Sequence, residues 1–227
     1  MTVRIERRLV PGPTGQIELA LDWPQTGEAP AGIAHIAHPH PLYGGSLDNK
    51  VVTTLARAFA ALGWLAVRSN FRGVGATEGQ HDEGRGELAD LMHLIGSVPQ
   101  IAGIGPARAL PLALAGFSFG SFVVAQAATA IQGRNAVRHL ILIGAAAGKW
   151  PMPAVDPKTL VIHGERDETI PLGNVFVWAA GCDVPVVVIP GADHFFHRRL
   201  PILKQLVTRH VLGSEAALLR VNSEGTG

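Results

Sequence analysis

A serine between two glycines stands where a buried stretch gives way to a helical pattern. Gly116-Phe117-Ser118-Phe119-Gly120 follows the small and apolar residues 110–115, and a helix-like segment begins with residues 121–125. A serine on such a strand-to-helix turn projects its hydroxyl above the end of the strand, and the flanking glycines let strand and helix pass closely. The N–H of Phe119 would lie at a helix N-terminus, where it could stabilise a developing oxyanion. The pattern favours Ser118 as a nucleophile, although the five residues alone would also fit a tight packing turn.

The base that would activate this serine is expected in a loop farther along the chain. A serine hydroxyl is a poor nucleophile at neutral pH, so it needs a histidine to accept its proton and a carboxylate to orient that histidine. His194 and His197 both follow the apolar run 184–189. We expect His194 to be the base, whereas His197 is more typical of a surface position and Asp193 of a turn.

Three carboxylates compete for the role of the acid. Glu165, Asp167 and Glu168 lie within four residues, directly after the apolar run 160–163. Their periodicity does not distinguish them. We favour Asp167, although an aspartate at this position could also cap a helix that begins near Pro171. The order along the chain is then serine, acid, histidine.

The elements that must position these groups alternate along the chain. Short runs rich in β-branched residues alternate with longer amphipathic segments, which is typical of parallel strands joined by crossover helices. The predicted strands are 31–37, 64–70, 110–117, 140–144, 160–163 and 184–189, and the predicted helices are 49–62, 86–97, 119–132, 173–180 and 199–212. Residues 3–9 and 16–22 predict an antiparallel hairpin at the sheet edge. The fold class is therefore α/β, a doubly wound and mostly parallel sheet whose site lies at the carboxyl ends of the strands.

Composition and charge limit the partners that this protein could have. A chain of 227 residues that is 47% hydrophobic is expected to form one domain over 1–213, followed by a frayed tail over 214–227. The net charge is +1, which gives no strong field toward nucleic acid or membranes, and we expect neither as a partner. A single cysteine, the lack of a long apolar segment and the lack of a signal-like start favour a cytoplasmic location.

No cofactor and no metal are expected. His38 and His40 stand on either side of a proline without a third ligand nearby, so a role in loop structure is favoured over metal binding. Gly73, Gly75 and Gly79 are similar to a dinucleotide fingerprint, but the last glycine comes one residue late and no helical pattern begins there. The chemistry is therefore expected from side chains and backbone amides alone.

The segments that carry these residues resemble the α/β-hydrolase superfamily, and in particular its compact bacterial serine hydrolases without a lid. The resemblance covers residues 33–196. It rests on the serine, acid and histidine segments and on three others: His38-Pro39-His40-Pro41-Leu42-Tyr43-Gly44-Gly45, Asp48-Asn49-Lys50-Val51-Val52 and Asn70-Phe71-Arg72-Gly73-Val74-Gly75.

This resemblance implies roles for further residues. The loop after the first parallel strand should supply a second oxyanion-hole donor beside Phe119, namely the N–H of Leu42, or that of Tyr43 if the register shifts by one residue. The family pattern His-Gly-x-x-Asp-x-x-Ile-Pro selects Asp167 over its acidic neighbours. Residues 145–158 are too few to form a lid, so the site should be open.

The residues and the resemblance together predict a serine hydrolase that cleaves ester or thioester bonds of a small acyl substrate through an acyl-enzyme. We expect substrate contacts from Tyr43, Trp150 and Phe195, although each of these could instead belong to the core, and Phe117 is expected to do so. Amide, lactone or peroxy-acid chemistry on the same residues is an alternative, as is a non-catalytic binding or scaffold role.

Overall fold

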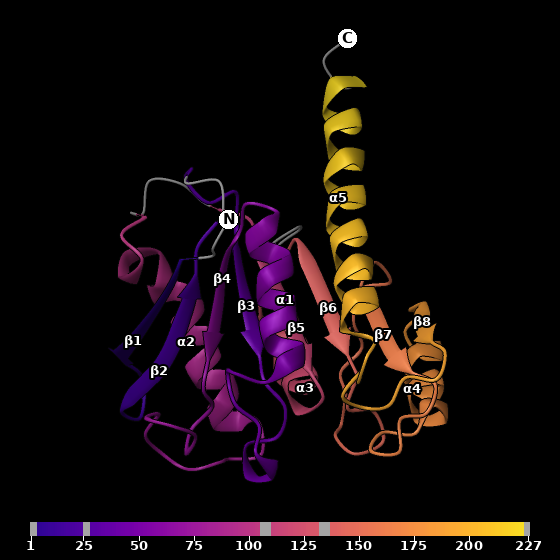
Figure 1. Ribbon diagram of the computed structural model, residues 1–227, viewed down its shortest axis with the longest axis horizontal. Coiled ribbons are helices and arrows are strands. Elements are labelled where there is room, and N and C mark those ends of the chain that lie inside the picture. Colours follow the sequence, from indigo (N-terminus) through magenta and orange to yellow (C-terminus); the bar gives the residue numbers. More distant parts are fainter. Residues whose placement is uncertain (1–3, 25–27, 105–109, 132–136, 225–227) are drawn as a thin grey trace.

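The computed structural model describes residues 4–24, 28–104, 110–131 and 137–224, with side chains up to residue 216. Val3 and Gln132, at the ends of a predicted strand and a predicted helix, lie outside the described residues, as do residues 225–227 of the predicted tail. Figure 1 shows a central sheet with helices on both of its faces.

Eight strands form this sheet, in the order β1-β2-β4-β3-β5-β6-β7-β8. β1 pairs antiparallel with β2, and β2 pairs antiparallel with β4, while all other neighbours are parallel. The strands are Ile5–Pro11 (β1), Gln16–Asp22 (β2), Ile33–Ala37 (β3), Leu65–Ser69 (β4), Leu112–Phe117 (β5), His139–Ile143 (β6), Leu160–Gly164 (β7) and Val186–Ile189 (β8). The predicted mostly parallel sheet with an antiparallel N-terminal hairpin is confirmed.

The helices cover the two faces of the sheet in different groups. They are Lys50–Ala61 (α1), Arg85–Ile101 (α2), Phe119–Ala130 (α3), Leu172–Ala180 (α4) and Leu200–Glu224 (α5), with a 3-10 turn over Pro41–Tyr43 (η1). α1 and α5 pack on the face toward the viewer in Figure 1, and α2 and α3 lie behind the sheet. Both faces of the sheet are therefore covered by helices, as in a doubly wound fold.

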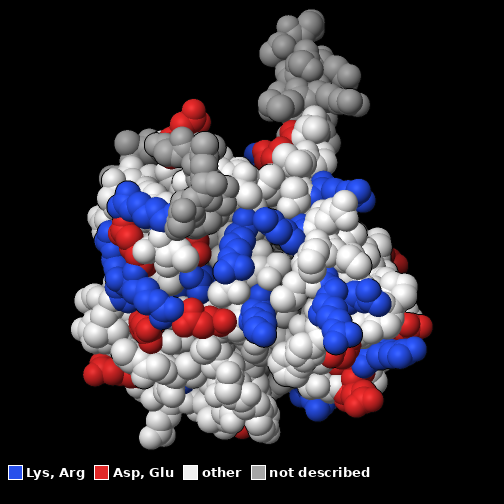
Figure 2. Space-filling view, in the orientation of Figure 1, with Lys and Arg blue, Asp and Glu red and all other residues white. Residues whose placement is uncertain are grey.

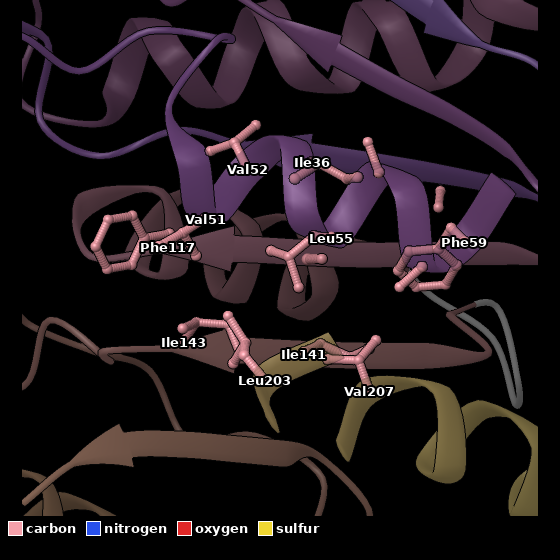
Figure 3. Packing of buried hydrophobic residues seen from close by; sticks show 14 of the residues in the cluster. Ile36, Val51, Val52, Leu55, Phe59, Phe117, Ile141, Ile143, Leu203 and Val207 are labelled. Atoms are coloured by element: carbon pink, nitrogen blue, oxygen red, sulfur yellow. The ribbon is translucent and has the colours of Figure 1, made fainter. Parts of the chain in front are cut away.

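Apolar residues from α1, α5 and the central strands form the core on one face of the sheet. Val51, Val52, Leu55 and Phe59 recur at helical spacing and are all buried, which makes this side of α1 the packing face. Figure 3 shows Val51, Leu55 and Phe59 on the side of α1 toward β6 and α5, with Phe117 of β5 beside Val51 and with Val52 on the side of Ile36 of β3. The labelled residues of β6 and α5 are Ile141, Ile143, Leu203 and Val207. This packing fixes the central strands, whose carboxyl ends carry the candidate site.

The winding direction of the chain reverses between β3 and β5. From β3 the chain passes through α1 to β4 on one side, and α2 then carries it back to β5 on the other side of β3. The loops that leave β3 and β5 therefore diverge, which opens a crevice at the carboxyl ends of these two strands. Ser118 directly follows β5, so it lies at this crevice.

The last helix is longer than the sequence predicts. We expected it to end at Leu212 and the tail from Ser214 to be frayed, but α5 continues to Glu224, and its far end rises clear of the sheet in Figure 1. Glu215 contacts both His139, at 3.1 Å, and Arg138, at 3.5 Å. This long-range pairing with the start of β6 holds the helix past its predicted end.

A buried ion pair joins the antiparallel hairpin to the parallel part of the sheet. Arg68 Nε of β4 donates to Asp22 Oδ2 of β2 at 2.7 Å, and both side chains are 3% exposed. Arg68 Nη1 also donates to the Leu47 carbonyl at 2.7 Å and lies 3.3 Å from the exposed Asp48 carboxylate. Removal of Asp22 would leave the buried guanidinium without its main partner.

We therefore predict that Asp22→Ala destabilises the protein strongly. The free energy of unfolding should fall by about 3 kcal/mol, the lower end of the range for breaking a buried pair, because Asp48 stays within reach of Arg68. Urea denaturation followed by circular dichroism measures the change. Asp82→Ala, which removes an exposed partner of Arg85, is the control and should have a much smaller effect. Equal effects of the two variants would show that the Arg68 pair does not stabilise the sheet.

Candidate active site

The structure brings Ser118, His194 and Asp167 into one chain of hydrogen bonds. His194 Nδ1 lies 2.7 Å from Asp167 Oδ2, and His194 Nε2 lies 2.9 Å from Ser118 Oγ. Because a carboxylate only accepts, Nδ1 donates to Asp167, which leaves Nε2 to accept the proton of the serine hydroxyl. All three residues are buried, with exposures of 5 to 8%. This arrangement is compatible with a nucleophile, a base and an orienting acid.

The turn from β5 into α3 holds Ser118 in a backbone conformation that non-glycine residues rarely adopt. Its φ is 55° and its ψ is −123°. A side chain at Gly116 would collide with the backbone of Gly120, and one at Gly120 would collide with the Ala37 and His38 carbonyls. The two glycines therefore allow β5, α3 and the end of β3 to pack closely, as the sequence pattern predicts for strand and helix.

Asp167 is fixed at both of its carboxylate oxygens. Oδ1 accepts the N–H groups of Thr169, at 2.9 Å, and Ile170, at 2.7 Å, so that Oδ2 is turned to His194. Of the competing carboxylates, Glu165 accepts the Gly191 N–H at 2.7 Å, and Glu168 is exposed. Asp167 is the one of the three that contacts the histidine.

The remaining alternatives lie turned away from the serine. Asp193 accepts the backbone N–H of His197 at 3.0 Å, and its other oxygen lies 2.6 Å from His197 Nδ1. Both side chains are largely exposed. This local pair closes the turn that presents His194, which agrees with the turn and surface positions expected for the two residues.

A second histidine, His163 at the end of β7, lies beneath Asp167. Its Nε2 donates to the Ile170 carbonyl at 2.9 Å and lies 3.3 Å from Asp167 Oδ2. Burial lowers the pKa of His163 below its ordinary value, so it is a neutral donor. The sequence patterns above predict no role for His163, although a polar residue at the end of an apolar strand, four residues before Asp167, could indicate one.

The predicted oxyanion-hole donors differ in the hydrogen bonds that their N–H groups form. Phe119 is the first residue of α3, so its N–H has no partner within the helix. The Leu42 N–H donates to His40 Nδ1 at 3.3 Å, and the Tyr43 N–H donates to the His40 carbonyl at 3.2 Å. Each of these two N–H groups thus has a partner within the loop, and both Leu42 and Tyr43 stay predictions for the second donor.

A pocket of about 250 Å³ opens at the serine. It is lined by His40, Tyr43, Ser118, Phe119, Ala146, Lys149, Trp150, Thr169 and Ile170. Tyr43 is 86% exposed at its rim, and Trp150 stacks on Phe122, with 5.3 Å between the ring centroids, while it also faces the pocket. Phe195 contacts the rings of His194 and Phe117 but does not line this pocket, so its contact with substrate stays a prediction.

His38 anchors the loop that follows β3. Its Nδ1 donates to the Pro39 carbonyl at 2.6 Å, and its Nε2 accepts the Phe71 N–H at 2.9 Å. Both ring nitrogens therefore bind backbone groups, one in the loop after β3 and one in the loop after β4, and burial lowers the pKa of His38 to about 4. Within the described ranges, no group of three or more His, Cys, Asp or Glu residues could hold a metal ion. Over the same residues, no helix has the length and apolar character that a membrane crossing requires.

The sheet, the strand-to-helix serine turn and the histidine–aspartate pair at the same edge define the α/β-hydrolase class. A lidless α/β serine hydrolase from Xanthomonas campestris is 35% identical, with a TM-score of 0.82 over 93% of this chain and 95% of its own. An α/β serine hydrolase homologue from Coxiella burnetii is 38% identical, with a TM-score of 0.77 over 90% and 96% of the two chains. This protein therefore belongs to the α/β serine hydrolases, and to those without a lid.

An uncharacterized protein of Rickettsia prowazekii (strain Madrid E) is 27% identical over 214 residues, which is 88% of this chain and 86% of the relative. No protein-family model matches the chain. Membership in the α/β serine hydrolases supports hydrolysis as its chemistry.

The buried, neutral His38 predicts a loss of stability in acid. Because its folded-state pKa of about 4 lies below the ordinary value, the unfolded chain binds more protons between these values, and stability falls as the pH falls. From about pH 7.5 to about pH 4.5 this one group should remove about 2 to 3 kcal/mol of the free energy of unfolding. In His38→Gln, the glutamine carbonyl oxygen can still accept the Phe71 N–H but does not titrate. The free energy of unfolding of this variant should therefore fall by about 2 to 3 kcal/mol less than that of the parent over the same pH range.

Urea denaturation at a series of pH values measures this difference. His93→Gln, which changes an exposed histidine of α2, should retain the pH dependence of the parent protein. If His38→Gln also retained it, His38 would not be the buried neutral group that the structure describes.

Proposed function

We propose that this protein is a serine hydrolase that cleaves carboxylic ester or thioester bonds of small acyl substrates through an acyl-enzyme. The observation that carries the proposal is the continuous hydrogen-bond chain from Ser118 Oγ through His194 to Asp167. Such a chain lets a neutral hydroxyl attack a carbonyl carbon at neutral pH.

In the proposed reaction, Ser118 Oγ attacks the carbonyl carbon while His194 Nε2 takes the hydroxyl proton. Asp167 stabilises the imidazolium that forms, and the Phe119 and Leu42 N–H groups hold the oxyanion. Collapse of this intermediate expels the alcohol or thiol, which receives the proton from His194. A water molecule, deprotonated by His194, then attacks the acyl-serine and releases the acid.

The nature of the pocket supports a small acyl substrate. The pocket has a volume of about 250 Å³, and its walls include Phe119, Ala146, Trp150 and Ile170. No separate lid lies between β6 and β7 to enclose a larger substrate, because residues 144–159 form turns and extended segments. Esters and thioesters need less assistance to the leaving group than amides, which suits an open, solvent-accessible site.

We expect Ser118→Ala to lose hydrolysis of both 4-nitrophenyl butanoate and the butanoyl thioester of N-acetylcysteamine. The loss in kcat should be roughly 10⁴-fold or more, because the nucleophile itself is removed. Release of nitrophenol and of free thiol measures the two rates. Ser97→Ala, which changes a serine of α2 distant from the site, should keep the parent's rates. Equal turnover by Ser118→Ala and the parent would contradict the proposal and favour a non-catalytic role.

The acid can be tested against its neighbour by the same chemical change at two positions. Asp167→Asn should lower kcat by roughly 10⁴-fold, because the amide cannot stabilise the imidazolium and favours the wrong histidine tautomer. Glu168→Gln alters an exposed residue next in sequence and should leave kcat close to that of the parent. If Glu168→Gln were the more damaged variant, the acid would be wrongly assigned.

A further inference from the structure

Lys149 brings a positive charge to the wall of the Ser118 pocket. The other titratable side chains of the lining are His40 and Tyr43. Burial, together with the neighbouring His81, lowers the pKa of His40 below its ordinary value, so His40 is neutral at pH 7. The positive charge of the pocket wall therefore comes from the ammonium group of Lys149.

No carboxylate of the described residues neutralises this ammonium group. The ion pairs of the described residues use other cations, and Lys149 forms none of them. Two buried carboxylates near the pocket residues pair with histidines instead: Asp167 lies 2.7 Å from His194, and Glu87 lies 2.8 Å from His81. Figure 2 shows that, on the viewed face, the middle of the lower end, at the carboxyl edge of the sheet, carries few charged side chains.

The backbone that carries Lys149 is fixed relative to the serine. The N–H groups of Lys149 and Trp150 both donate to the Ala146 carbonyl, at 3.2 and 3.0 Å. The Ala146 N–H in turn donates to Ser121 Oγ at 3.0 Å, and this hydroxyl donates to the Ser118 carbonyl. The lysine therefore stands on a turn that is hydrogen-bonded to the nucleophile's own turn.

The preceding glycine completes this turn. Gly148 has a φ of +77°, in the left-handed region, and a side chain there would collide with Asn174 of α4. The turn thus fixes the backbone of Lys149 at the rim of a pocket whose walls also include the apolar residues Phe119, Trp150 and Ile170.

We propose that the substrate hydrolysed at Ser118 carries a carboxylate, which pairs with Lys149 while the scissile carbonyl lies at the serine. This inference rests on the proposed function, because it names the class of ester that the same pocket selects. An unpaired ammonium group beside apolar and aromatic walls favours an anionic group over a neutral or cationic one. The cleaved bond and the mechanism are unchanged, and the lysine acts by binding the substrate.

Two pairs of substrates test the proposal, one for each side of the scissile bond. The first pair is 4-nitrophenyl hemiadipate and its methyl ester, which differ by a carboxylate on the acyl side. The second pair is 4-butanoyloxybenzoate and its methyl ester, which differ by a carboxylate on the leaving group. The measured quantity is the ratio of kcat/KM for the anionic substrate to that for its neutral partner.

For at least one pair, this ratio should fall by about two- to fivefold in Lys149→Met, the range expected for an ion pair that water can reach. Lys149→Arg should retain the ratio, and added salt should lower it in the parent but not in Lys149→Met. The control is Lys158→Met, which changes an exposed lysine that does not line the Ser118 pocket and should keep the parent's ratio. Thermal unfolding checks that each variant is folded.

The two possible failures are distinguishable in this experiment. If Ser118-dependent hydrolysis occurs but Lys149→Met has the parent's ratio for both pairs, the carboxylate proposal is overturned and the serine hydrolase proposal stands. If neither the anionic nor the neutral esters are hydrolysed in a Ser118-dependent way, the proposed function itself fails.

Discussion

The backbone of Ser118 is held where few non-glycine residues are found, and the geometry of the site depends on this constraint. A residue in such a conformation costs about 1 to 3 kcal/mol and persists only when its surroundings determine it. Here Phe117 and Phe119, on either side of the serine, are fully buried, and Gly116 lies against Gly120. Packing of β5 and α3 therefore offsets the strain, and the serine hydroxyl is presented at the crevice between β5 and β3.

The other two groups reach Ser118 because of the strand order. Asp167 follows β7 and His194 follows β8, so both come from the side of the sheet away from the loop that follows β3. The end of β6 lies between them and the serine, and there Gly144 adopts a φ of +54° with its missing Cβ position 3.3 Å from the His194 ring. A small residue at this point leaves the imidazole room to lie between acid and nucleophile.

Local patterns in the sequence predicted the strands, the helices, Ser118 and His194, since each of these two residues follows a strand whose apolar run is visible. They narrowed the acid to three neighbouring carboxylates, of which the family resemblance selected Asp167. Long-range contacts were not predictable in this way. The pairing of Glu215 with His139 extends α5 past Leu212, and neither residue indicates the other in sequence. Similarly, Lys149 belongs to the site only because Ser121 joins two turns that are far apart in the chain.

The account depends most directly on Ser118 being a nucleophile activated by the folded structure. Labelling with a fluorophosphonate, followed by peptide mass spectrometry, tests this without knowledge of the substrate. We predict one adduct per chain, on the peptide that contains Ser118, and no adduct when the protein is unfolded in urea before labelling. An adduct on another residue, or the absence of labelling in the folded protein, would contradict the account.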